Sequence, residues 1–434
     1  MRILSELAIN IFYKYICNKD YTCNSRQGSI AEIVYGDVSM KDGHATFPKP
    51  ELGEPYLLTP GPLTTSIEVK RAMLRDWGSW DEDFRTLTAD LRQRLLALLG
   101  PSSDGFECVP MQGSGTFGVE AMLGTFLPRD GKVLVLSNGA YGLRAAEAVR
   151  YLGRQFSVID KGDYLPPRGE DVSAAIAADP AITHVMAIHC ETSSGILNPL
   201  AEIAAATEAA GRKLLVDSMS AFGAIDLRPD EIPFEAVVSS ANKCIEGVPG
   251  FSFVLARRDA LEATKGNAHS LSLDLHAQWS VMETSGQWRY TPPTHVVAAF
   301  IEALKVHEVE GGVAARGQRY ATNRDALVAG MRDIGFETLL DASWLSPIIV
   351  TFFSPADPKF EFGQFYELMK RQGYIIYPGK LTAVDSFRIG CIGRMDTAVM
   401  EDVVTAAGFA LATMGVVDAA PPPDALTERQ RLSG

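Results

Sequence analysis

Between residues 106 and 255, short apolar runs alternate with stretches whose apolar residues recur at helical spacing. A short apolar run favours a buried strand, whereas helical spacing favours a helix that covers the sheet. Strands that alternate with helices predict parallel βαβ units, and hence an α/β fold with a large, doubly wound, mostly parallel sheet. The predicted strands are 106–111, 133–136, 156–159, 183–189, 214–217, 236–238 and 251–255, and the helices between the first five are 119–127, 141–152, 171–178 and 200–210.

The helical segments lengthen after residue 255, and strand signals then return. Four units are expected: an N-terminal extension of uncertain structure (1–50), a large domain (51–310) whose first residues can join the smaller one, a small α+β domain (311–416) and a disordered tail (417–434). In the later part of the chain, strands are predicted at 348–353, 374–377 and 387–390, and helices at 294–309, 319–334, 362–371 and 397–414.

Charge and cysteine usage exclude several classes of protein. The 434-residue chain has a formal net charge of −13, which argues against a nucleic acid or an anionic membrane as partner, because clustered Lys and Arg bind those surfaces. Its six cysteines are scattered without metal-ligand spacing, so reduced thiols in a cytoplasmic protein and no bound metal are expected. No run approaches the roughly 18 apolar residues of a membrane helix, and a soluble protein is expected.

Two charged residues follow predicted strands in the middle of the sheet. The run Leu214-Leu215-Val216 ends in Asp217, at the carboxyl end of a strand, where open α/β sheets bind ligands. Lys243 has small and apolar neighbours that would desolvate its amine and lower its pKa. Pyridoxal 5'-phosphate chemistry needs a carboxylate that keeps a pyridine nitrogen protonated and a lysine that bonds to an aldehyde. Taken singly, Lys243 would more often be a surface lysine and Asp217 a helix cap, so the pair carries the argument.

A glycine turn offers a place for the cofactor's phosphate. Gln112-Gly113-Ser114-Gly115-Thr116 joins a predicted strand to a helix, and the N–H groups of a glycine-rich helix N-terminus can hold an anion. No lysine follows the glycines, which argues against a nucleoside-triphosphate loop. A turn of this kind can equally be a tight connection without a ligand.

From about residue 56 to residue 415 the chain resembles the class V aminotransferases, a family of fold-type-I pyridoxal phosphate enzymes. Jointly the matching segments are specific, whereas Lys243 and Asp217 alone would fit many relatives. The segments are Leu58-Thr59-Pro60-Gly61-Pro62, Arg75 to Phe84, Gly113-Ser114-Gly115-Thr116-Phe117, His189-Cys190-Glu191-Thr192, Val216-Asp217-Ser218-Met219, Ala241-Asn242-Lys243-Cys244, Tyr290-Thr291-Pro292-Pro293-Thr294-His295 and Phe387-Arg388-Ile389-Gly390. The first 50 residues have no counterpart in the family's pattern.

The resemblance implies a role for each matched residue. Lys243 is the catalytic lysine, and Tyr141 stacks on the cofactor ring, unless it is a core tyrosine. Arg388 binds the carboxylate or phosphonate of the substrates through its planar fork of donors, unless it belongs to a structural ion pair. Thr294 reaches the phosphate of the neighbouring subunit's cofactor, which requires a homodimer. The other cofactor-binding residues are Ser114, Gly115, Thr116, Thr192, Asp217, Met219 and Asn242.

The implied activity is a ping-pong transfer of the amino group of 2-aminoethylphosphonate to pyruvate, in phosphonate catabolism. The aromatic, acidic segment at 77–84 and Thr291-Pro292-Pro293-Thr294 favour it over an alanine:glyoxylate or serine:pyruvate aminotransferase of the same class. Cysteine desulfuration would need a mobile cysteine, but Cys391 follows a strand-like run and looks structural. The presence of both Lys243 and Asp217 disfavours a non-catalytic binding protein on this fold.

Overall fold

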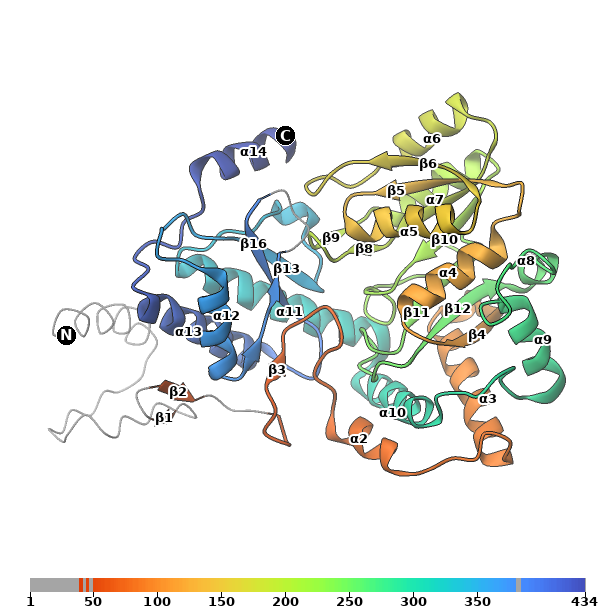
Figure 1. Ribbon diagram of the computed structural model, residues 1–434, viewed down its shortest axis with the longest axis horizontal. Coiled ribbons are helices and arrows are strands. Elements are labelled where there is room, and N and C mark those ends of the chain that lie inside the picture. The colour runs from red at the N-terminus through yellow and green to blue at the C-terminus, as the bar shows by residue number, and fades with distance from the viewer. Residues whose placement is uncertain (1–38, 42–43, 47–49, 380–383, 434) are drawn as a thin grey trace, which may run out of the picture.

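The computed structural model describes residues 39–41, 44–46, 50–379 and 384–433. Two bodies built on separate sheets make up this part of the chain, and Figure 1 shows the blue C-terminal elements beside the orange-to-green ones. Most of the N-terminal extension lies outside the described residues, and what is described of it is a hairpin of β1 (Ser39–Lys41) and β2 (His44–Thr46). All of the predicted site residues fall within the described ranges.

The larger body is built on a seven-stranded sheet in the order β4-β12-β11-β10-β7-β5-β6. The strands run parallel except β12, which is antiparallel to both of its neighbours. The predicted mostly parallel sheet is therefore confirmed. The strands are β4 (Phe106–Gln112), β5 (Lys132–Ser137), β6 (Gln155–Asp160), β7 (Ile182–Ile188), β10 (Lys213–Asp217), β11 (Ala236–Ser240) and β12 (Phe251–Arg257).

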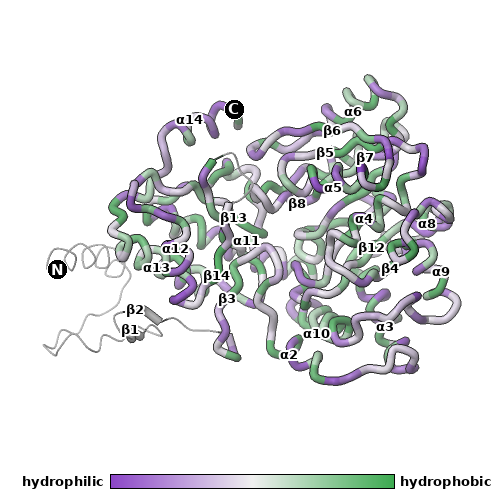
Figure 2. Tube along the Cα trace, viewed as in Figure 1, coloured by the Kyte–Doolittle hydropathy of each residue, from purple (hydrophilic) through white to green (hydrophobic). Residues whose placement is uncertain are grey.

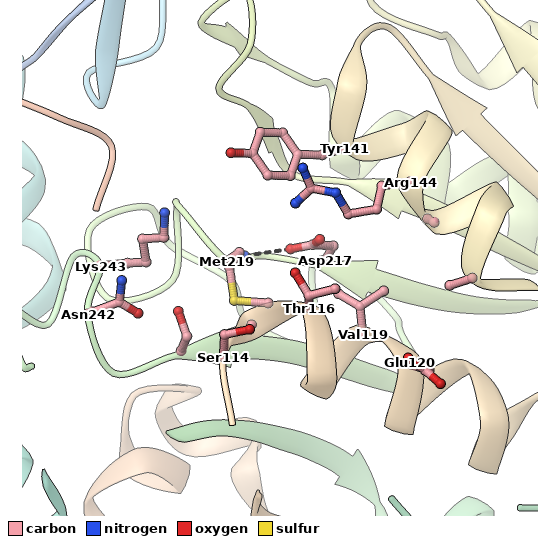
Figure 3. Close-up of a pocket in the computed structure, with 14 residues that line it drawn as sticks. Ser114, Thr116, Val119, Glu120, Tyr141, Arg144, Asp217, Met219, Asn242 and Lys243 are labelled. Carbon is pink, nitrogen blue, oxygen red and sulfur yellow. Dashed lines mark hydrogen bonds between the residues drawn. The ribbon is translucent and has the colours of Figure 1, made fainter. Parts of the chain in front are cut away.

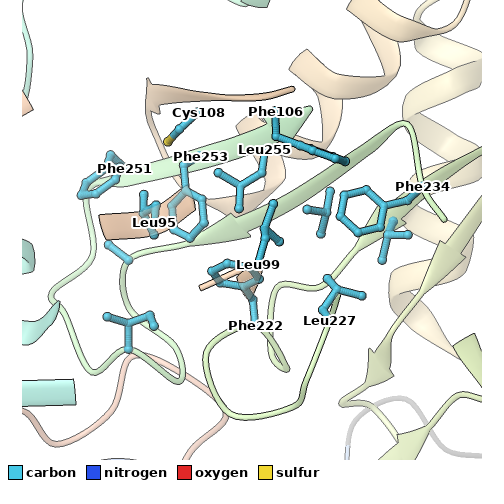
Figure 4. Close-up of a cluster of buried hydrophobic side chains, with 14 of the residues drawn as sticks. Leu95, Leu99, Phe106, Cys108, Phe222, Leu227, Phe234, Phe251, Phe253 and Leu255 are labelled. Atoms are coloured by element: carbon cyan, nitrogen blue, oxygen red, sulfur yellow. The ribbon is translucent and has the colours of Figure 1, made fainter. Parts of the chain in front are cut away.

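Both faces of this sheet are apolar and covered by helices, as parallel sheets require. In β5, Leu134 and Leu136 pack in one core and Val133 and Val135 in the other, because successive side chains of a strand point to opposite faces. Figure 4 shows the aromatic part of the first core, and Figure 2 shows hydrophobic residues gathered toward the inside of each body. Replacing a buried side chain such as Leu95 with alanine would cost roughly 2–5 kcal/mol.

Helices α3, α6, α7 and α10 pack in the first core, and α4, α5 and α8 pack in the second. The helices of this body are α2 (Ile67–Arg71), α3 (Glu82–Ala97), α4 (Gly115–Phe126), α5 (Ala140–Tyr151), α6 (Gly169–Ala178), α7 (Leu200–Ala209), α8 (Arg258–Ala263), α9 (Leu275–Ser285) and α10 (Thr294–Glu310). The short hairpin of β8 (Cys190–Glu191) and β9 (Ile196–Leu197) follows β7.

The smaller body has a three-stranded antiparallel sheet, β13-β16-β15, and its own core. The start of the described chain joins this body, since β3 pairs with β14 and Leu58 packs in the core. Helix α11 connects the two bodies: Tyr320 donates to the carbonyl of Cys244 (3.3 Å), whereas Leu327 lies in the smaller body's core. The elements are β3 (Tyr56–Leu57), α11 (Gly312–Asp333), β13 (Ile349–Phe353), α12 (Phe362–Arg371), β14 (Tyr374–Ile375), β15 (Tyr377–Pro378), β16 (Ser386–Gly390) and α13 (Thr397–Met414).

The C-terminal segment differs from the prediction. The sequence predicts a disordered tail at 417–434, but helix α14 (Pro423–Ser433) forms there, so this prediction is wrong. Ala425 is buried in a cluster with Phe353, and Arg429 donates to the carbonyl oxygen of Thr338 (2.6 Å). The last proline of the run, Pro423, is the first residue of α14. Proline suits this position, because an N–H there would have no hydrogen-bond partner within the helix.

Among the described residues, α13 is the one helix that is long and apolar enough to cross a membrane by length and composition. The sequence predicts no membrane helix, because no run approaches the roughly 18 apolar residues that one needs, and Glu401 and Asp402 lie within α13. Met400 and Ala407, on the buried side of α13, pack in the core of the smaller body. The helix is therefore accounted for as a core helix.

Candidate active site

Asp217 closes strand β10 at the carboxyl edge of the larger sheet. Its backbone carbonyl accepts a hydrogen bond from the N–H of His189 (2.8 Å), and its carboxylate accepts one from the N–H of Met219 (2.9 Å). The residue is 6% exposed, and burial raises the pKa of its carboxyl to about 6, against the opposing effects of the Met219 N–H and Lys243. The carboxylate is therefore mostly ionised at neutral pH and presents a negative charge at this edge.

Lys243 lies in the loop between β11 and β12, on the same edge. Its amine donates to the carbonyl oxygen of Pro60 (2.6 Å), and the Glu246 N–H closes the loop on the carbonyl of Lys243 (2.7 Å). The side chain is half-buried, and burial lowers the pKa of its amine to about 8, with the positive charge of Arg144 acting in the same direction. Such an amine is uncharged often enough near neutral pH to act as a nucleophile or a base.

Gly61 lets the chain before the sheet come close to Lys243. Its φ is +119°, and a Cβ there would lie 2.6 Å from Lys243 Cδ and 2.7 Å from the carbonyl oxygen of Asn242. Glycine alone fits both this conformation and this space. The turn around Pro60 and Gly61 therefore holds the lysine side chain in place.

Helix α4 points its N-terminus toward the same region. Ser114 is the N-cap residue, and its side chain makes no capping hydrogen bond. The first N–H groups of a helix and its positive dipole end favour an anion. Gly115 is closely packed, because a Cβ there would lie 2.5 Å from Met219 Sδ. A carboxylate, an amine and the N-terminus of a helix thus meet at one sheet edge.

A cavity of about 200 Å³ lies between these groups. In Figure 3, Lys243 lies on one side of it and Asp217 and Arg144 on the other, with Tyr141 above and Ser114 below. The predicted site residues that line the cavity are Ser114, Gly115, Thr116, Tyr141, Asp217, Met219, Asn242 and Lys243. The lining also includes residues that the sequence analysis did not single out, namely Val119, Glu120, Arg144, Ala145, Ala148 and Ser240.

Arg144 is the missed residue with the clearest sequence signal. It lies three positions after Tyr141 on α5, and residues at that spacing share one face of a helix. Its guanidinium carbon lies 4.9 Å from the centre of the Tyr141 ring, within the range of a cation–π contact. Its charge opposes the burial that raises the pKa of Asp217 and adds to the burial that lowers the pKa of Lys243.

Thr192 and Arg388 are not among the residues that line the cavity, but they contact each other. Arg388 on β16 is 5% exposed, and its guanidinium donates to the carbonyl oxygens of Thr192 (2.8 Å) and Pro378 (3.0 and 3.1 Å). These bonds use three of the roughly five N–H groups of an arginine and fix the plane of the fork. The Thr192 hydroxyl oxygen is buried without a hydrogen-bond partner in the described part of the chain.

Thr294 begins helix α10 and lies outside the cavity lining. Its hydroxyl is 3.5 Å from His295 Nδ1, and its role toward a neighbouring subunit stays a prediction. The described residues contain no group of His, Cys, Asp and Glu side chains that could hold a metal ion.

Solved structures identify the class of protein that has this fold. The pyridoxamine-pyruvate aminotransferase of Mesorhizobium loti matches with a TM-score of 0.76 and 23% identity, covering 89% of this chain and 99% of that one. The alanine–glyoxylate aminotransferase of Nostoc sp. matches with a TM-score of 0.76 and 20% identity, covering 87% of this chain and 100% of that one. The fold is that of the fold-type-I pyridoxal phosphate aminotransferases.

Sequence comparison narrows this class to a family. The family model described as Aminotransferase class-V matches residues 107–361. The 2-aminoethylphosphonate–pyruvate transaminase of Rhizobium meliloti (strain 1021) is 69% identical over 382 residues, which are 88% of this chain and 100% of that protein. The 2-aminoethylphosphonate–pyruvate transaminase 1 of Paraburkholderia xenovorans (strain LB400) is 64% identical over 385 residues, 89% of this chain and 99% of that protein. This chain belongs to the class V aminotransferases.

The family implies pyridoxal 5'-phosphate as cofactor, and the residues around the cavity fit it. The cofactor has an aldehyde, a ring nitrogen and a phosphate, which need an amine, a carboxylate and an anion-binding group. Lys243 and Asp217 lie on opposite sides of the cavity, and the N-terminus of α4 with the uncapped Ser114 borders it. Outside the cavity lining, the buried hydroxyl of Thr192 has no hydrogen-bond partner among the described residues and could bond to a further polar group of a ligand.

Proposed function

We propose that this chain transfers the amino group of 2-aminoethylphosphonate to pyruvate, giving phosphonoacetaldehyde and alanine, as a step in phosphonate catabolism. The observation that carries the proposal is the 69% identity to the Rhizobium meliloti transaminase, whose whole length the chain covers. The cavity supports it, because Lys243 and Asp217 supply the two protein groups that amine transfer needs.

The residues that would hold the cofactor come from both sides of the cavity. Pyridoxal phosphate, when bound, supplies an aldehyde that exchanges amines and a ring that withdraws electrons from the carbon bearing the amino group. Lys243 would hold the aldehyde end, Asp217 would keep the ring nitrogen protonated, and Tyr141 would stack on the ring. The groups assigned to the phosphate are Ser114, Gly115, Thr116 and Asn242, and those assigned to the rest of the ring are Thr192 and Met219.

Lys243 moves the proton in each half of the reaction. Once the substrate's amino group has displaced it, Lys243 Nζ would act as the base that takes the proton from the carbon bearing that amino group and then as the acid that returns it. Its pKa of about 8 lies close to the pH at which it must both accept and release a proton. With pyruvate as acceptor, the same amine would move the proton in the opposite direction.

Arg388 holds the substrate's anionic end in both halves. Its guanidinium plane is fixed by the carbonyls of Pro378 and Thr192, and those bonds leave about two of its N–H groups for a ligand. A planar fork of donors fits a phosphonate or a carboxylate. One arginine can therefore serve 2-aminoethylphosphonate and pyruvate in turn.

A substrate panel with the cofactor-loaded protein tests this proposal. We expect the highest kcat/KM for 2-aminoethylphosphonate with pyruvate, with alanine and phosphonoacetaldehyde formed in equal amounts. Alanine with glyoxylate and serine with pyruvate are the matched alternatives within the class. Faster turnover of either alternative, or no turnover of 2-aminoethylphosphonate, would overturn the proposal.

We further infer that the protein works as a cytoplasmic homodimer in which Thr294 completes the neighbouring subunit's phosphate site. Phe117 (52% exposed) and Tyr290 (46% exposed) support an interface beside the cavity and α10, because aromatic residues are enriched in subunit interfaces. A reducing compartment is supported by the unpaired state of the described cysteines, which are Cys108, Cys190, Cys244 and Cys391.

Mixing two inactive variants tests the dimer. In a mixed dimer of Lys243→Ala and Thr294→Ala subunits, a threonine acting across the interface leaves one site intact and puts both defects in the other. Activity should therefore reappear on mixing. If Thr294 acted within its own subunit, each site would carry one defect and the mixture would stay inactive.

A further inference from the structure

Helix α5, which carries Tyr141 and Arg144, has no cap of its own. Its N-cap residue is Gly139, which has no side chain to accept the first N–H groups of the helix. Two of these groups, the N–H groups of Tyr141 and Gly142, donate to the carboxylate of Glu191 at 3.1 and 3.3 Å. The hairpin of β8 and β9, beside α5 in Figure 1, thus supplies the cap from about 50 residues further along the chain.

The Glu191 carboxylate accepts several hydrogen bonds. Besides the two N–H groups of α5, its carboxylate accepts the N–H (3.2 Å) and the hydroxyl (2.5 Å) of Ser193, whose oxygen in turn accepts the N–H of Ala140 (3.2 Å). The side chain is 0% exposed, so its charge depends on these donors and on the positive end of the helix. A Cβ at Gly139 would lie 2.2 Å from Ser193 Oγ, which shows how closely the two segments pack.

Thr192, between Glu191 and Ser193, holds the other functional group. Its carbonyl oxygen accepts a hydrogen bond from the Arg388 guanidinium at 2.8 Å. Three consecutive residues therefore bind the start of α5 on one side and the guanidinium from the smaller body on the other. Any shift of this segment would move the Tyr141 ring and Arg388 relative to each other.

We propose that Glu191 is a positioning residue for the amine transfer, because its carboxylate fixes the start of α5, and so the Tyr141 ring, relative to the Arg388 guanidinium held by Thr192. The inference rests on the proposed function, which takes Tyr141 as the stacking ring and Arg388 as the anion receptor. Glu191 acts through these two groups, and neither the cavity lining nor the sequence pattern assigns it a role.

The variant Glu191→Gln keeps the size of the side chain and turns one acceptor oxygen into an NH₂ group. That group cannot accept the N–H groups of α5 or of Ser193, so the segment must shift. We expect the Kd of pyridoxal phosphate for the apoprotein, measured by spectral titration, to rise roughly 10- to 100-fold, since each loss of about 1.4 kcal/mol in binding free energy raises Kd about tenfold. The visible circular dichroism of the bound cofactor should weaken, and KM should rise for both substrates.

Glu107→Gln is the matched control. Glu107 is also buried, but it lies on strand β4, at the end remote from the cavity. There its carboxylate accepts hydrogen bonds from Arg92 (2.9 Å) and Arg258 (2.7 Å). This variant should lower the melting temperature and leave the Kd of the cofactor, its dichroism and both KM values unchanged. If Glu191→Gln cannot be purified, Ser193→Ala removes part of the same network and should change the same readouts by a smaller factor.

The proposal would be overturned by a Glu191→Gln protein with a lowered melting temperature and an unchanged Kd, dichroism and KM, because Glu191 would then be merely structural. The cofactor titration does not depend on the substrate assignment. A wild-type protein that bound pyridoxal phosphate but did not turn over 2-aminoethylphosphonate would contradict the proposed function. The Kd and the dichroism of Glu191→Gln could still be compared with those of wild type.

Discussion

The two regions that hold the reacting groups are built differently. At the edge of the larger sheet, burial shifts the pKa of the Asp217 carboxyl up to about 6 and that of the Lys243 amine down to about 8. In the smaller body, Arg388 is held by backbone carbonyls, and although burial lowers the pKa of its guanidinium, an arginine stays charged near neutral pH. The first region is suited to proton transfer, and in the proposed function the second would supply a fixed positive charge to a substrate anion.

A buried charged cluster connects these regions away from the cavity. Glu246, three residues after Lys243, accepts hydrogen bonds from Arg319 (2.8 Å) and the hydroxyl of Tyr320 (2.7 Å). Arg319 also donates to the carbonyl oxygen of Gly393 (2.7 Å), in the loop after the Arg388 strand. The two regions therefore differ in chemistry but are joined by one network of buried hydrogen bonds.

The largest effect is expected from Lys243→Ala, which removes both the nucleophile and the proton carrier. General acid–base catalysis alone contributes roughly 10²- to 10⁴-fold, so kcat should fall by at least about 10³-fold in steady-state assays. The visible band of the bound cofactor should change as well. A variant with more than about a tenth of the wild-type kcat would show that the sheet edge does not carry the chemistry.

Arg388→Ala should weaken both half-reactions together. Loss of a largely desolvated, charge-assisted contact costs on the order of 2–4 kcal/mol, or roughly 30- to 1000-fold in kcat/KM. Arg388→Lys keeps the charge without the fork and should recover part of the loss. Single-turnover rates with 2-aminoethylphosphonate and with pyruvate separate the halves. A loss confined to one substrate would mean that each anion has its own receptor.

Asp217→Asn should change how the stability of the apoprotein depends on pH. The carboxyl's folded-state pKa of about 6 lies above its ordinary value of 3.8, so the stability that its protonated form contributes is lost as the pH rises from about 4 through 6. The free energy of unfolding of the variant minus that of wild type should therefore increase by on the order of 2–3 kcal/mol between pH 4 and pH 7. Denaturant unfolding from pH 4 to 7 measures this. A difference that moved in favour of wild type would contradict the assigned burial cost, and Arg388 variants should show no such pH dependence.

What the sequence predicted depended on how local its signals are. The sequence predicts that Asp217 and Lys243 lie at one sheet edge, because Asp217 ends one apolar strand and Lys243 follows the next, and both line the cavity there. Glu191 was missed as a cap because its partners on α5 lie 49 and 50 residues away, where no local spacing points to them. A proline run is typical of a disordered tail, so the sequence does not predict helix α14, in which Ala425 is buried by distant segments.

Borohydride reduction of the cofactor-loaded protein, followed by peptide mapping, is the direct test of Lys243 as the lysine that holds the cofactor. Reduction fixes the cofactor to the amine that holds it, so the label reports which lysine bonds to the aldehyde. We expect label on Lys243, whose amine borders the cavity opposite Asp217. Label on any other lysine would contradict this assignment.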